Sequence, residues 1–241
     1  MQLRSLPPNP LCRMSKALIV FAKRPSPGRV KTRLTPPFSP EDAAKLYRCM
    51  LLDVLAKTGQ MTGVDRLLFY EQGDGVPEFF AETVGEGESY PQEGDGLGAR
   101  LAAAFDRTFG QGYDSAAVIG TDSPHLPPDY IEQAFDLLND PRVDAVFGPT
   151  EDGGYYLLAM KRLHRELFEG IAWSTPEVLE QSLARAESAG IATALLPVWH
   201  DVDTAADLLR PELVDPGNGA PLTREFILRH PPHSPVAPGG R

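Results

Sequence analysis

Short apolar runs rich in β-branched residues recur along the chain, and they alternate with longer stretches that carry apolar residues at helical spacing. The length and composition of the short runs predict β-strands. The predicted strands cover residues 17–22, 65–70, 115–120 and 143–148. Alternation of strands with helical stretches favours an α/β class with a largely parallel sheet.

The longer stretches are predicted to be helices. They cover residues 41–58, 97–109, 128–139, 175–189 and 204–210. Ser39 followed by Pro40 is typical of a helix N-cap with proline at the first helical position, and Pro127 and Pro176 indicate similar starts.

A further strand-like run covers residues 153–160, only a few positions after the run at 143–148. Because the gap is too short for a crossover helix, the two runs are expected to pair antiparallel or to lie side by side through a tight loop. The sheet is therefore predicted to be mixed. In open α/β sheets the ligand binds outside the carboxyl ends of the strands, so the loops after residues 22, 120 and 148 should converge on one crevice.

Composition narrows the functional classes. The 241 residues are 42% hydrophobic, which suits one compact domain, expected over residues 14–230. The formal net charge of -10 argues against nucleic acid or an anionic membrane as a partner. Cys12 and Cys49 lack the spacing of a disulfide framework or a zinc site, and no apolar run approaches the ~18 residues of a membrane span. We therefore expect a cytoplasmic protein; its oligomeric state stays open.

The ends of the chain are expected to lie outside the fold. Residues 1–13 contain three prolines where a signal peptide would need an apolar segment, and Met14 begins the first strand-like run. We predict a disordered extension or an upstream start there. The Pro/Gly-rich residues 231–241 are predicted to form a loose tail.

The segment FAKRPSPGRVKTRL, residues 21–34, carries five cations directly after the first predicted strand. Prolines and Gly28 should fix its backbone, while Lys23, Lys31 and Arg33 place positive charge at the crevice. Because it lacks the GxxxxGK[ST] spacing, it is not a Walker A loop. Its position favours binding of nucleotide phosphates, and a solvated basic loop is the alternative.

Carboxylates follow two later segments. Asp122, in VIGTDSPHLP, comes just after a predicted strand and is the leading ligand for a divalent cation; an Asx-turn or helix cap is the alternative. Asp201 and Asp203, in WHDVDTAADLL, are spaced to project on one side and supply a second carboxylate, although Asp203 also fits a helix N-cap. Oxygen ligands of this kind suit Mg²⁺ or Mn²⁺.

The segment GPTEDGGYYLLAM is glycine-rich and lies between two predicted strands. Gly153 and Gly154 permit close approach of a ligand, and of the two following tyrosines only one should face the crevice. A hairpin turn with core aromatic residues explains the segment equally well. Asp152 is either a catalytic base or a turn residue. Gly96, in GDGLGA, lacks a good preceding strand and more plausibly belongs to a substrate-side turn than to a dinucleotide fingerprint.

These segments, together with IAWSTPEVL at residues 171–179, resemble a known family over about residues 16–210. It comprises the glycosyltransferase-A-like proteins known as radical-SAM/selenodomain-associated transferases, which are related to 2-phospho-L-lactate guanylyltransferase and molybdenum-cofactor guanylyltransferases. The resemblance implies a nucleotide-diphospho-sugar transferase fold, a three-layer α/β/α sandwich with a mixed, mostly parallel sheet and a metal-assisted nucleotide site.

The resemblance also implies roles for particular residues. Lys23, Lys31 and Arg33 would hold the nucleotide phosphates, and Asp122 would hold the metal with Asp201 or Asp203 as its partner. The acceptor or sugar side would be lined by Gly153, Gly154, Trp173 and Ser174. From the residues themselves we add Gly28 and Gly96 to the nucleotide site and Tyr155 to the acceptor side, and we predict catalytic roles for Lys31, Asp122 and Asp152. Where glycosyltransferases carry a DxD motif this chain reads TDSP, so its carboxylates must come from distant segments.

Three hypotheses follow. The first is a Mg²⁺- or Mn²⁺-dependent glycosyltransferase-like enzyme that uses a nucleotide or nucleotide-sugar donor and a small-molecule acceptor. The second is a nucleotidylyltransferase, guanylyltransferase-like, acting on a small phosphorylated acceptor. Both need charge neutralisation at phosphate more than covalent catalysis. The third is a non-catalytic nucleotide-binding module.

Overall fold

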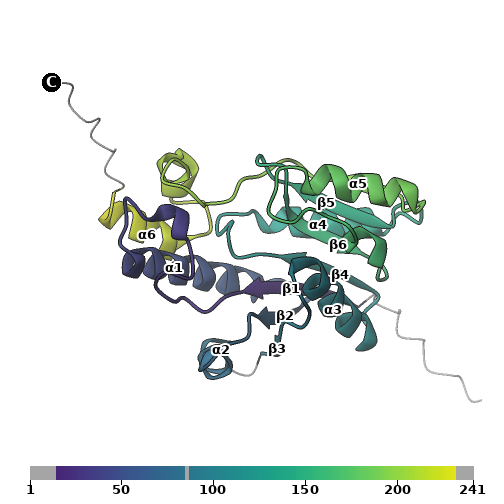
Figure 1. Ribbon diagram of the computed structural model, residues 1–241, viewed down its shortest axis with the longest axis horizontal. Helices are drawn as coiled ribbons and strands as arrows, with labels where there is room; N and C mark the ends of the chain where they lie inside the picture. Colours follow the sequence, from purple (N-terminus) through teal and green to yellow (C-terminus); the bar gives the residue numbers. More distant parts are fainter. Residues whose placement is uncertain (1–14, 85–86, 232–241) are drawn as a thin grey trace, which may run out of the picture.

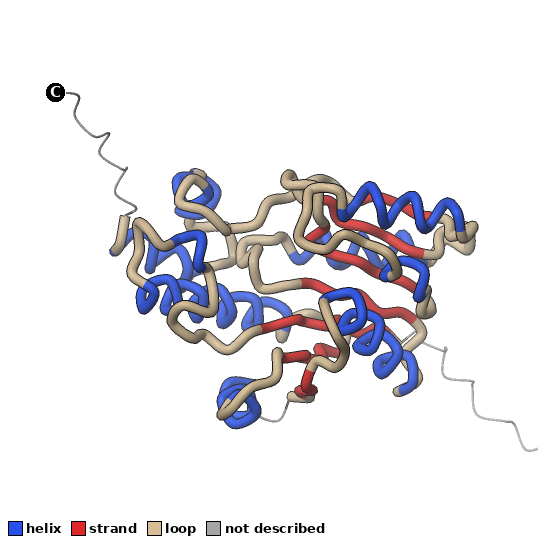
Figure 2. The backbone as a smooth tube through the Cα atoms, in the orientation of Figure 1, coloured by secondary structure: helices blue, strands red, loops and turns tan. Residues whose placement is uncertain are grey.

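The computed structural model describes residues 15–84 and 87–231, so the predicted extension at 1–13 and the tail from 232 onwards lie outside the described residues. A seven-stranded sheet runs through the described part in the order β3-β2-β1-β4-β6-β5-β7 (Figures 1 and 2). The strands are β1 (Lys16–Ala22), β2 (Asp65–Tyr70), β3 (Ser89–Pro91), β4 (Ser115–Ile119), β5 (Ala145–Pro149), β6 (Tyr155–Met160) and β7 (Thr193–Leu195). β6 pairs antiparallel with both of its neighbours, and the remaining pairs are parallel.

Helices cover both faces of the sheet. They are α1 (Pro40–Thr58), α2 (Val76–Val84), α3 (Leu97–Gly110), α4 (Pro128–Leu138), α5 (Val178–Ser188) and α6 (Pro221–Arg229). α1, α2 and α4 bury apolar side chains in one core, whereas α3 and α5 pack in a second core on the other face (Figure 1). The three-layer α/β/α sandwich with a mixed, mostly parallel sheet is as predicted, including the antiparallel pair formed by β5 and β6.

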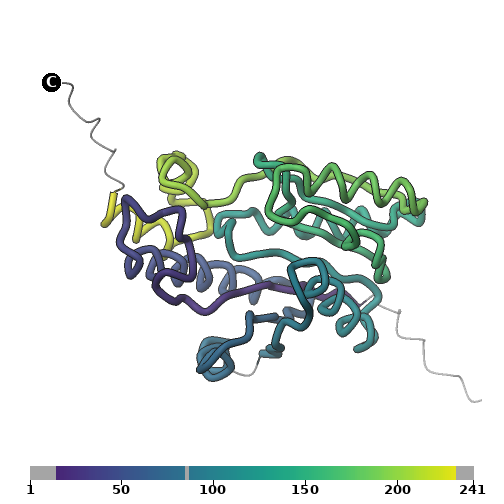
Figure 3. The backbone as a smooth tube through the Cα atoms, in the orientation of Figure 1, coloured from purple at the N-terminus to yellow at the C-terminus, as the bar shows by residue number. Residues whose placement is uncertain are grey.

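Local sequence explains where the first and last helices begin. The Ser39 side chain accepts a hydrogen bond from the Asp42 amide at 3.1 Å and caps α1, as its sequence indicated. The start of α6 is capped from a distance, because the buried Asp53 carboxylate on α1 accepts from the amides of Leu222 and Thr223 at 3.1 and 2.7 Å. The end of the described chain is thereby fixed against α1, as the colours in Figure 3 show.

Several elements differ from the prediction. The helix predicted at 204–210 is wrong: only a short 3-10 helix forms at Asp207–Leu209. Asp207 accepts from the amides of Asp203 and Thr204, at 3.1 and 2.7 Å, as in a capped first turn, but Arg210, which precedes Pro211, is extended and ends the helix there. The segment before GDGLGA, which the sequence did not favour as a strand, contains β3, and β3 pairs parallel with β2. α2, α6 and β7 were also not predicted.

The order of strands places the ligand crevice. The chain leaves β1 toward β2 and β3 and then returns to β4 on the other side of β1, so a topological switch point lies between the carboxyl ends of β1 and β4. Because β6 runs antiparallel, it brings its first residue, Tyr155, to this same edge. No helix among the described residues is long and apolar enough to cross a membrane.

Candidate functional site

A cavity of about 620 Å³ opens at the switch point. Its lining includes four cations of the loop after β1, namely Lys23, Arg29, Lys31 and Arg33, and also Asp122 and Asp203. The loops after residues 22 and 120 therefore converge, as predicted, although Thr150 in the loop after β5 lines a smaller cavity of about 150 Å³ beside it. A group of cations of this acidic chain therefore lines one cavity at the ends of its strands.

Lys31 lies at the centre of the site. Its ammonium donates to Asp122 Oδ1 and, at 2.8 Å, to Asp203 Oδ1. The lysine side chain is 3% exposed, whereas those of Asp122 and Asp203 are 48% and 35% exposed toward solvent and the cavity. Burial alone would lower the pKa of Lys31, but the ion pairs with Asp122 and Asp203 raise it above its ordinary value. The lysine is therefore charged and shared between two carboxylates from distant segments.

The backbone around Lys31 is unusual. Lys31 has φ 48° and ψ 40°, the left-handed region that residues with a side chain seldom adopt, directly before the 3-10 helix Thr32–Leu34. Non-glycine residues held in this region cluster at functional sites, where the surrounding structure maintains them. This conformation positions the lysine between the carboxylates.

The loop after β4 and the segment at 200–203 are tied together behind the carboxylates. The Val202 amide donates to the Asp122 carbonyl at 2.9 Å, and the Ser123 hydroxyl donates to the His200 carbonyl at 3.0 Å. His125 and His200 share a hydrogen bond of 2.8 Å between their Nε2 atoms. His125 is buried. These bonds hold Asp122 and Asp203 across one gap.

Asp201 does not join the pair. Its carboxylate accepts from the Ser123 hydroxyl at 2.6 Å and makes no ion pair with Lys31 within the described residues. Burial, with Asp122 nearby, raises the pKa of Asp201 to about 7. Residues 200–203 are not in a strand, so the alternation behind the prediction does not apply, although both Asp201 and Asp203 line the smaller cavity. Asp203 is the residue that shares Lys31 with Asp122.

Tyr47 is a site residue that sequence reasoning missed. It lies on α1, 3% exposed, and its hydroxyl accepts from the Lys23 amide at 2.9 Å and hydrogen-bonds Thr121 Oγ1 at 2.8 Å. It thus joins the cationic loop to the residue beside Asp122. In the sequence Tyr47 falls on the apolar stripe of a helix, where only its phenol distinguishes it from a core residue.

Two members of the cationic loop do not take part in the cavity. Arg24 turns away, because its guanidinium donates to the Asp74 carbonyl at 3.0 Å and stacks 6.0 Å from the Phe79 ring. Gly28 has φ 71° and shapes the turn, but it does not line the cavity. Its predicted contact with the nucleotide is thus replaced by a conformational role.

The far wall of the cavity contains part of the predicted acceptor group. Tyr155, Tyr156 and Ser174 line it, and Gly96 lines it at the start of α3. The two tyrosines pack on opposite faces of the sheet, with Tyr155 in the core under α3 and α5 and Tyr156 in the other. Both nevertheless reach the cavity at the sheet edge, so the expectation that only one would face it is wrong.

Other predicted acceptor residues serve packing. Gly153 has φ 87°, and a Cβ there would lie 2.0 Å from the Pro176 carbonyl oxygen. Trp173 packs so closely on Gly98 that a Cβ on that glycine would lie 2.6 Å from the indole nitrogen. Neither Gly153, Gly154 nor Trp173 lines the main cavity.

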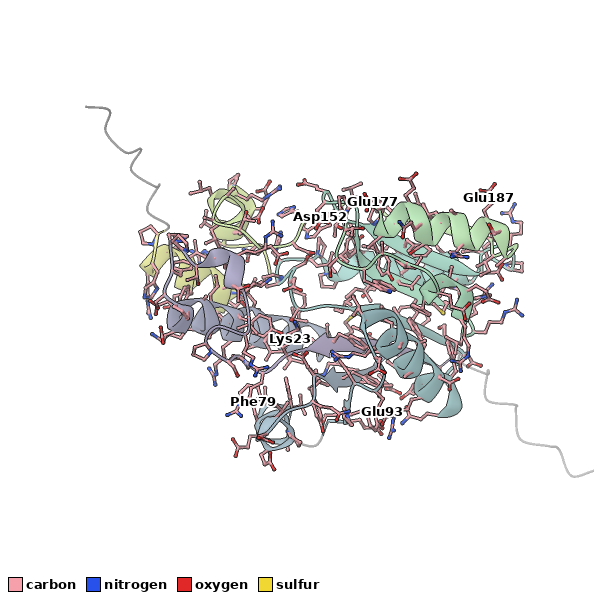
Figure 4. The ribbon with its side chains drawn as sticks, in the orientation of Figure 1. Lys23, Phe79, Glu93, Asp152, Glu177 and Glu187 are labelled. Carbon is pink, nitrogen blue, oxygen red and sulfur yellow. The ribbon has the colours of Figure 1, made fainter. Side chains whose placement is uncertain are left out.

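Asp152 is held in the turn between β5 and β6. Its Oδ1 accepts from the Thr150 hydroxyl at 2.6 Å and from the Gly154 amide at 3.3 Å. Figure 4 shows Asp152 well apart from Lys23, which lies near the end of β1. Of the two predicted roles, this geometry favours the turn residue over the catalytic base.

The cavity is also lined by two polar residues that the sequence did not single out, one after β3 and one on α3. Gln92 is buried and donates through Nε2 to the Phe69 carbonyl at 3.0 Å. Arg100, on α3, contacts Glu71 Oε1 at 3.3 Å and also lines the cavity. Gln92 follows β3, the short strand that sequence reasoning missed, so its place at the edge was hidden as well.

The donor set suits a divalent cation in part. The Asp122 and Asp203 oxygens converge on one atom, Lys31 Nζ, and two carboxylates that meet at one point are a suitable start for Mg²⁺ or Mn²⁺, which take further oxygens from substrate phosphate and water. Within residues 15–84 and 87–231 no three His, Cys, Asp or Glu side chains are arranged to hold a metal ion. The residues present therefore fit a two-carboxylate site.

This fold and cavity define the nucleotide-diphospho-sugar transferase class of structures. A candidate nucleotide-diphospho-sugar transferase from Desulfovibrio desulfuricans is 30% identical, with a TM-score of 0.78, and the match covers 88% of this chain and 98% of the other. The family model described as "Uncharacterized protein conserved in bacteria (DUF2064)" matches residues 54–175, and the chain belongs to this family. No curated protein matches the chain.

More distant structures share the fold alone. CMP:2-keto-3-deoxy-manno-octonic acid synthetase complexed with CTP is 15% identical with a TM-score of 0.53, and the match covers 80% of this chain and 95% of the other. Molybdopterin-guanine dinucleotide biosynthesis protein A from Archaeoglobus fulgidus is 14% identical with a TM-score of 0.51, covering 89% and 99%. The comparisons support an enzyme of the transferase class, as expected from the sequence.

Proposed function

We propose that the protein is a divalent-metal-dependent transferase that binds a nucleotide or nucleotide-sugar donor at the switch point between β1 and β4. The observation that carries this proposal is the convergence, in one cavity, of four loop cations with two carboxylates from separate segments. Cations neutralise phosphate charge, and paired carboxylates suit Mg²⁺ or Mn²⁺. A solvated basic loop would not need a buried lysine held between carboxylates.

The residues divide into roles by position. Lys23, Arg29 and Arg33 would bind the donor phosphates and orient the bond that breaks. Asp122 and Asp203 would hold the metal ion, which would neutralise charge on the diphosphate as it leaves. Tyr47 would keep the cationic loop and the Asp122 loop in register through its bonds to Lys23 and Thr121.

The acceptor wall favours the glycosyl form of the reaction. The chain from residue 150 to 175 contributes only Tyr155, Tyr156 and Ser174 to the main cavity, and none of these carries a charge at neutral pH. A phosphorylated acceptor would need cations there. An uncharged hydroxylated acceptor fits this wall better, which makes glycosyl transfer the first candidate.

Nucleotidylyl transfer is the second candidate. The distant structures named above include a synthetase complexed with CTP and a molybdopterin-guanine dinucleotide biosynthesis protein. Arg33 and Arg210 line the smaller cavity near Asp152, which gives this reaction two cations on the acceptor side, one of them, Arg210, paired with Glu151. In this version a phosphorylated acceptor attacks the α-phosphate of a nucleoside triphosphate, and pyrophosphate leaves.

A thermal-shift screen tests the proposal. Nucleoside triphosphates, nucleoside diphosphates and nucleotide-sugars are offered with and without Mn²⁺ to the native protein and to Asp122→Ala. A ligand at 100 times its Kd stabilises by about 2.7 kcal/mol, which raises the Tm by roughly 5–10 °C for a chain of this size. We expect a Mn²⁺-dependent shift with one nucleotide-sugar that the variant loses. A shift with a triphosphate only would favour nucleotidylyl transfer.

Turnover then separates an enzyme from a binding module. With the ligand from the screen, Asp122→Ala is expected to lower kcat by about 10²–10³-fold or more, the scale of losing one preorganised electrostatic group. An active variant with an unchanged metal requirement would overturn the assignment of Asp122. Binding without turnover of any acceptor would identify the non-catalytic module.

A further inference from the structure

Lys31 occupies the point at which the two carboxylates meet. One ammonium contacts both Asp122 Oδ1 and Asp203 Oδ1, and the lysine side chain is almost fully buried while the carboxylates remain open to the cavity. A carboxylate pair that faces a phosphate-binding cavity without a cation would repel both its own members and the ligand. Lys31 supplies the missing charge from within the chain.

A divalent cation on the same two oxygens cannot share that point with an ammonium. Both ions need the Asp122 and Asp203 oxygens that now face Lys31, and two cations in contact repel each other strongly in a partly buried site. Arg33, the next cation along, reaches Asp203 only at 3.9 Å and is largely exposed, so it does not replace Lys31 in this role.

We propose that Lys31 is an internal competitor of the metal ion, and that metal binding moves its ammonium from the two carboxylates to the phosphates of the donor. This inference rests on the proposed function, since it requires the phosphate and metal subsites. The lysine already lines the cavity, so its ammonium passes from one set of oxygens to another without crossing the core. Metal and nucleotide then bind cooperatively, because the phosphate accepts the cation that the metal displaces.

The test measures Mn²⁺ binding without nucleotide, by electron paramagnetic resonance of free Mn²⁺, on the native protein and on Lys31→Met. Methionine preserves length and removes the charge. We expect Lys31→Met to bind Mn²⁺ at least tenfold more tightly than the native protein. Arg24→Met is the matched control, because it removes a cation from the same loop that turns away from the cavity and makes no ion pair with either carboxylate among the described residues. Its Mn²⁺ affinity should stay within about threefold of the native value.

Two further measurements protect the result. If Lys31→Met is poorly folded without metal, its Tm should recover on addition of Mn²⁺ more than the native Tm does, because Mn²⁺ replaces the lost charge. The double variant Lys31→Met with Asp203→Asn should lose the gain in affinity, which locates the effect at this carboxylate pair. In the native protein a nucleoside diphosphate should tighten Mn²⁺ binding, and in Lys31→Met this tightening should be smaller.

The outcomes separate this inference from the proposed function. Native protein that binds Mn²⁺ and nucleotide together, with a Lys31→Met variant that binds Mn²⁺ equally or more weakly, would overturn the competition and leave the transferase proposal standing. Failure of every variant to bind Mn²⁺ would overturn both the inference and the metal dependence.

Discussion

Two polar, glycine-containing loops lie at the same edge of the sheet, and they use their polar groups in opposite ways. The loop after β1 turns Lys23, Lys31 and Arg33 to the cavity, where Lys31 contacts the carboxylates of two other segments. The turn between β5 and β6 satisfies its polar groups internally, since Asp152 accepts from Thr150 and Gly154. Position at a strand end therefore defines a candidate site, whereas the partner of each polar atom decides its role.

The largest effect of a single substitution in the turn between β5 and β6 is expected at Gly153. Its φ of 87° and the 2.0 Å approach of a Cβ to the Pro176 oxygen predict that Gly153→Ala destabilises the fold by about 2–5 kcal/mol. Urea unfolding measures this loss. The nucleotide affinity of the folded variant should be unchanged. Gly190→Ala is the control for backbone strain alone, because Gly190 has a φ of 68° and no atom lies within 4 Å of the place of a Cβ. A stable variant that no longer binds nucleotide would return Gly153 to the site.

Asp201, near Asp122 on the other side of the comparison, is expected to make the stability of the fold depend on pH. Its pKa is raised to about 7 by burial and the nearby Asp122, so the folded state binds a proton that the unfolded state releases near pH 4. Its contribution to stability is therefore present below about pH 4 and is lost as the pH rises toward 7. Asp201→Asn should remove this dependence and be more stable at pH 8 by on the order of 2 kcal/mol.

Unfolding in urea at several pH values, with a chelator present, measures the effect. Asp203→Asn serves as the comparison, because that carboxylate faces Lys31 instead of Ser123. A native protein whose stability does not fall between pH 4 and 7 relative to Asp201→Asn would contradict the assignment of a protonated Asp201.

The smallest effect is expected at Asp152. Asp152→Asn retains an oxygen that accepts from the Thr150 hydroxyl, so its stability should change by less than about 1 kcal/mol and its turnover by less than about threefold. Steady-state kinetics with the donor from the screen provide the measurement. A loss of a hundredfold in kcat would make Asp152 the catalytic base and remove the contrast between the two loops.

Much of the architecture could be predicted because its signals are local. The run at 65–70 is β2 to the residue, and the Ser39–Pro40 pair begins α1 as its chemistry dictates. β3 was not predicted because its three residues, one of them proline, show little periodicity. Pairing with β2 is enough to make them a strand. The predicted helix at 204–210 is cut short because Arg210, which precedes Pro211, takes an extended backbone.

The site was predictable by residue type but not by partnership. Lys31 and Asp122 were recognised from their places after two strands, and the structure brings them into contact. The sequence left open whether Asp201 or Asp203 pairs with Asp122, because residues 200–203 form no regular secondary structure whose period would orient the two side chains. Tyr47 and Arg100 lie on helices, where the side chains that reach a cavity follow the same spacing as those that reach the core.

The antiparallel course of β6 has a consequence for how the protein could diversify. The hairpin that leads into β6 is a separate piece of chain from the parallel strands that carry the cationic loop and Asp122, so its exposed positions can vary while Gly153 stays fixed by its contact with Pro176. In the proposed function, the donor and acceptor sides would therefore lie on separate pieces of chain. Exchange of residues 150–176 between relatives is a natural way to move acceptor preference from one scaffold to another.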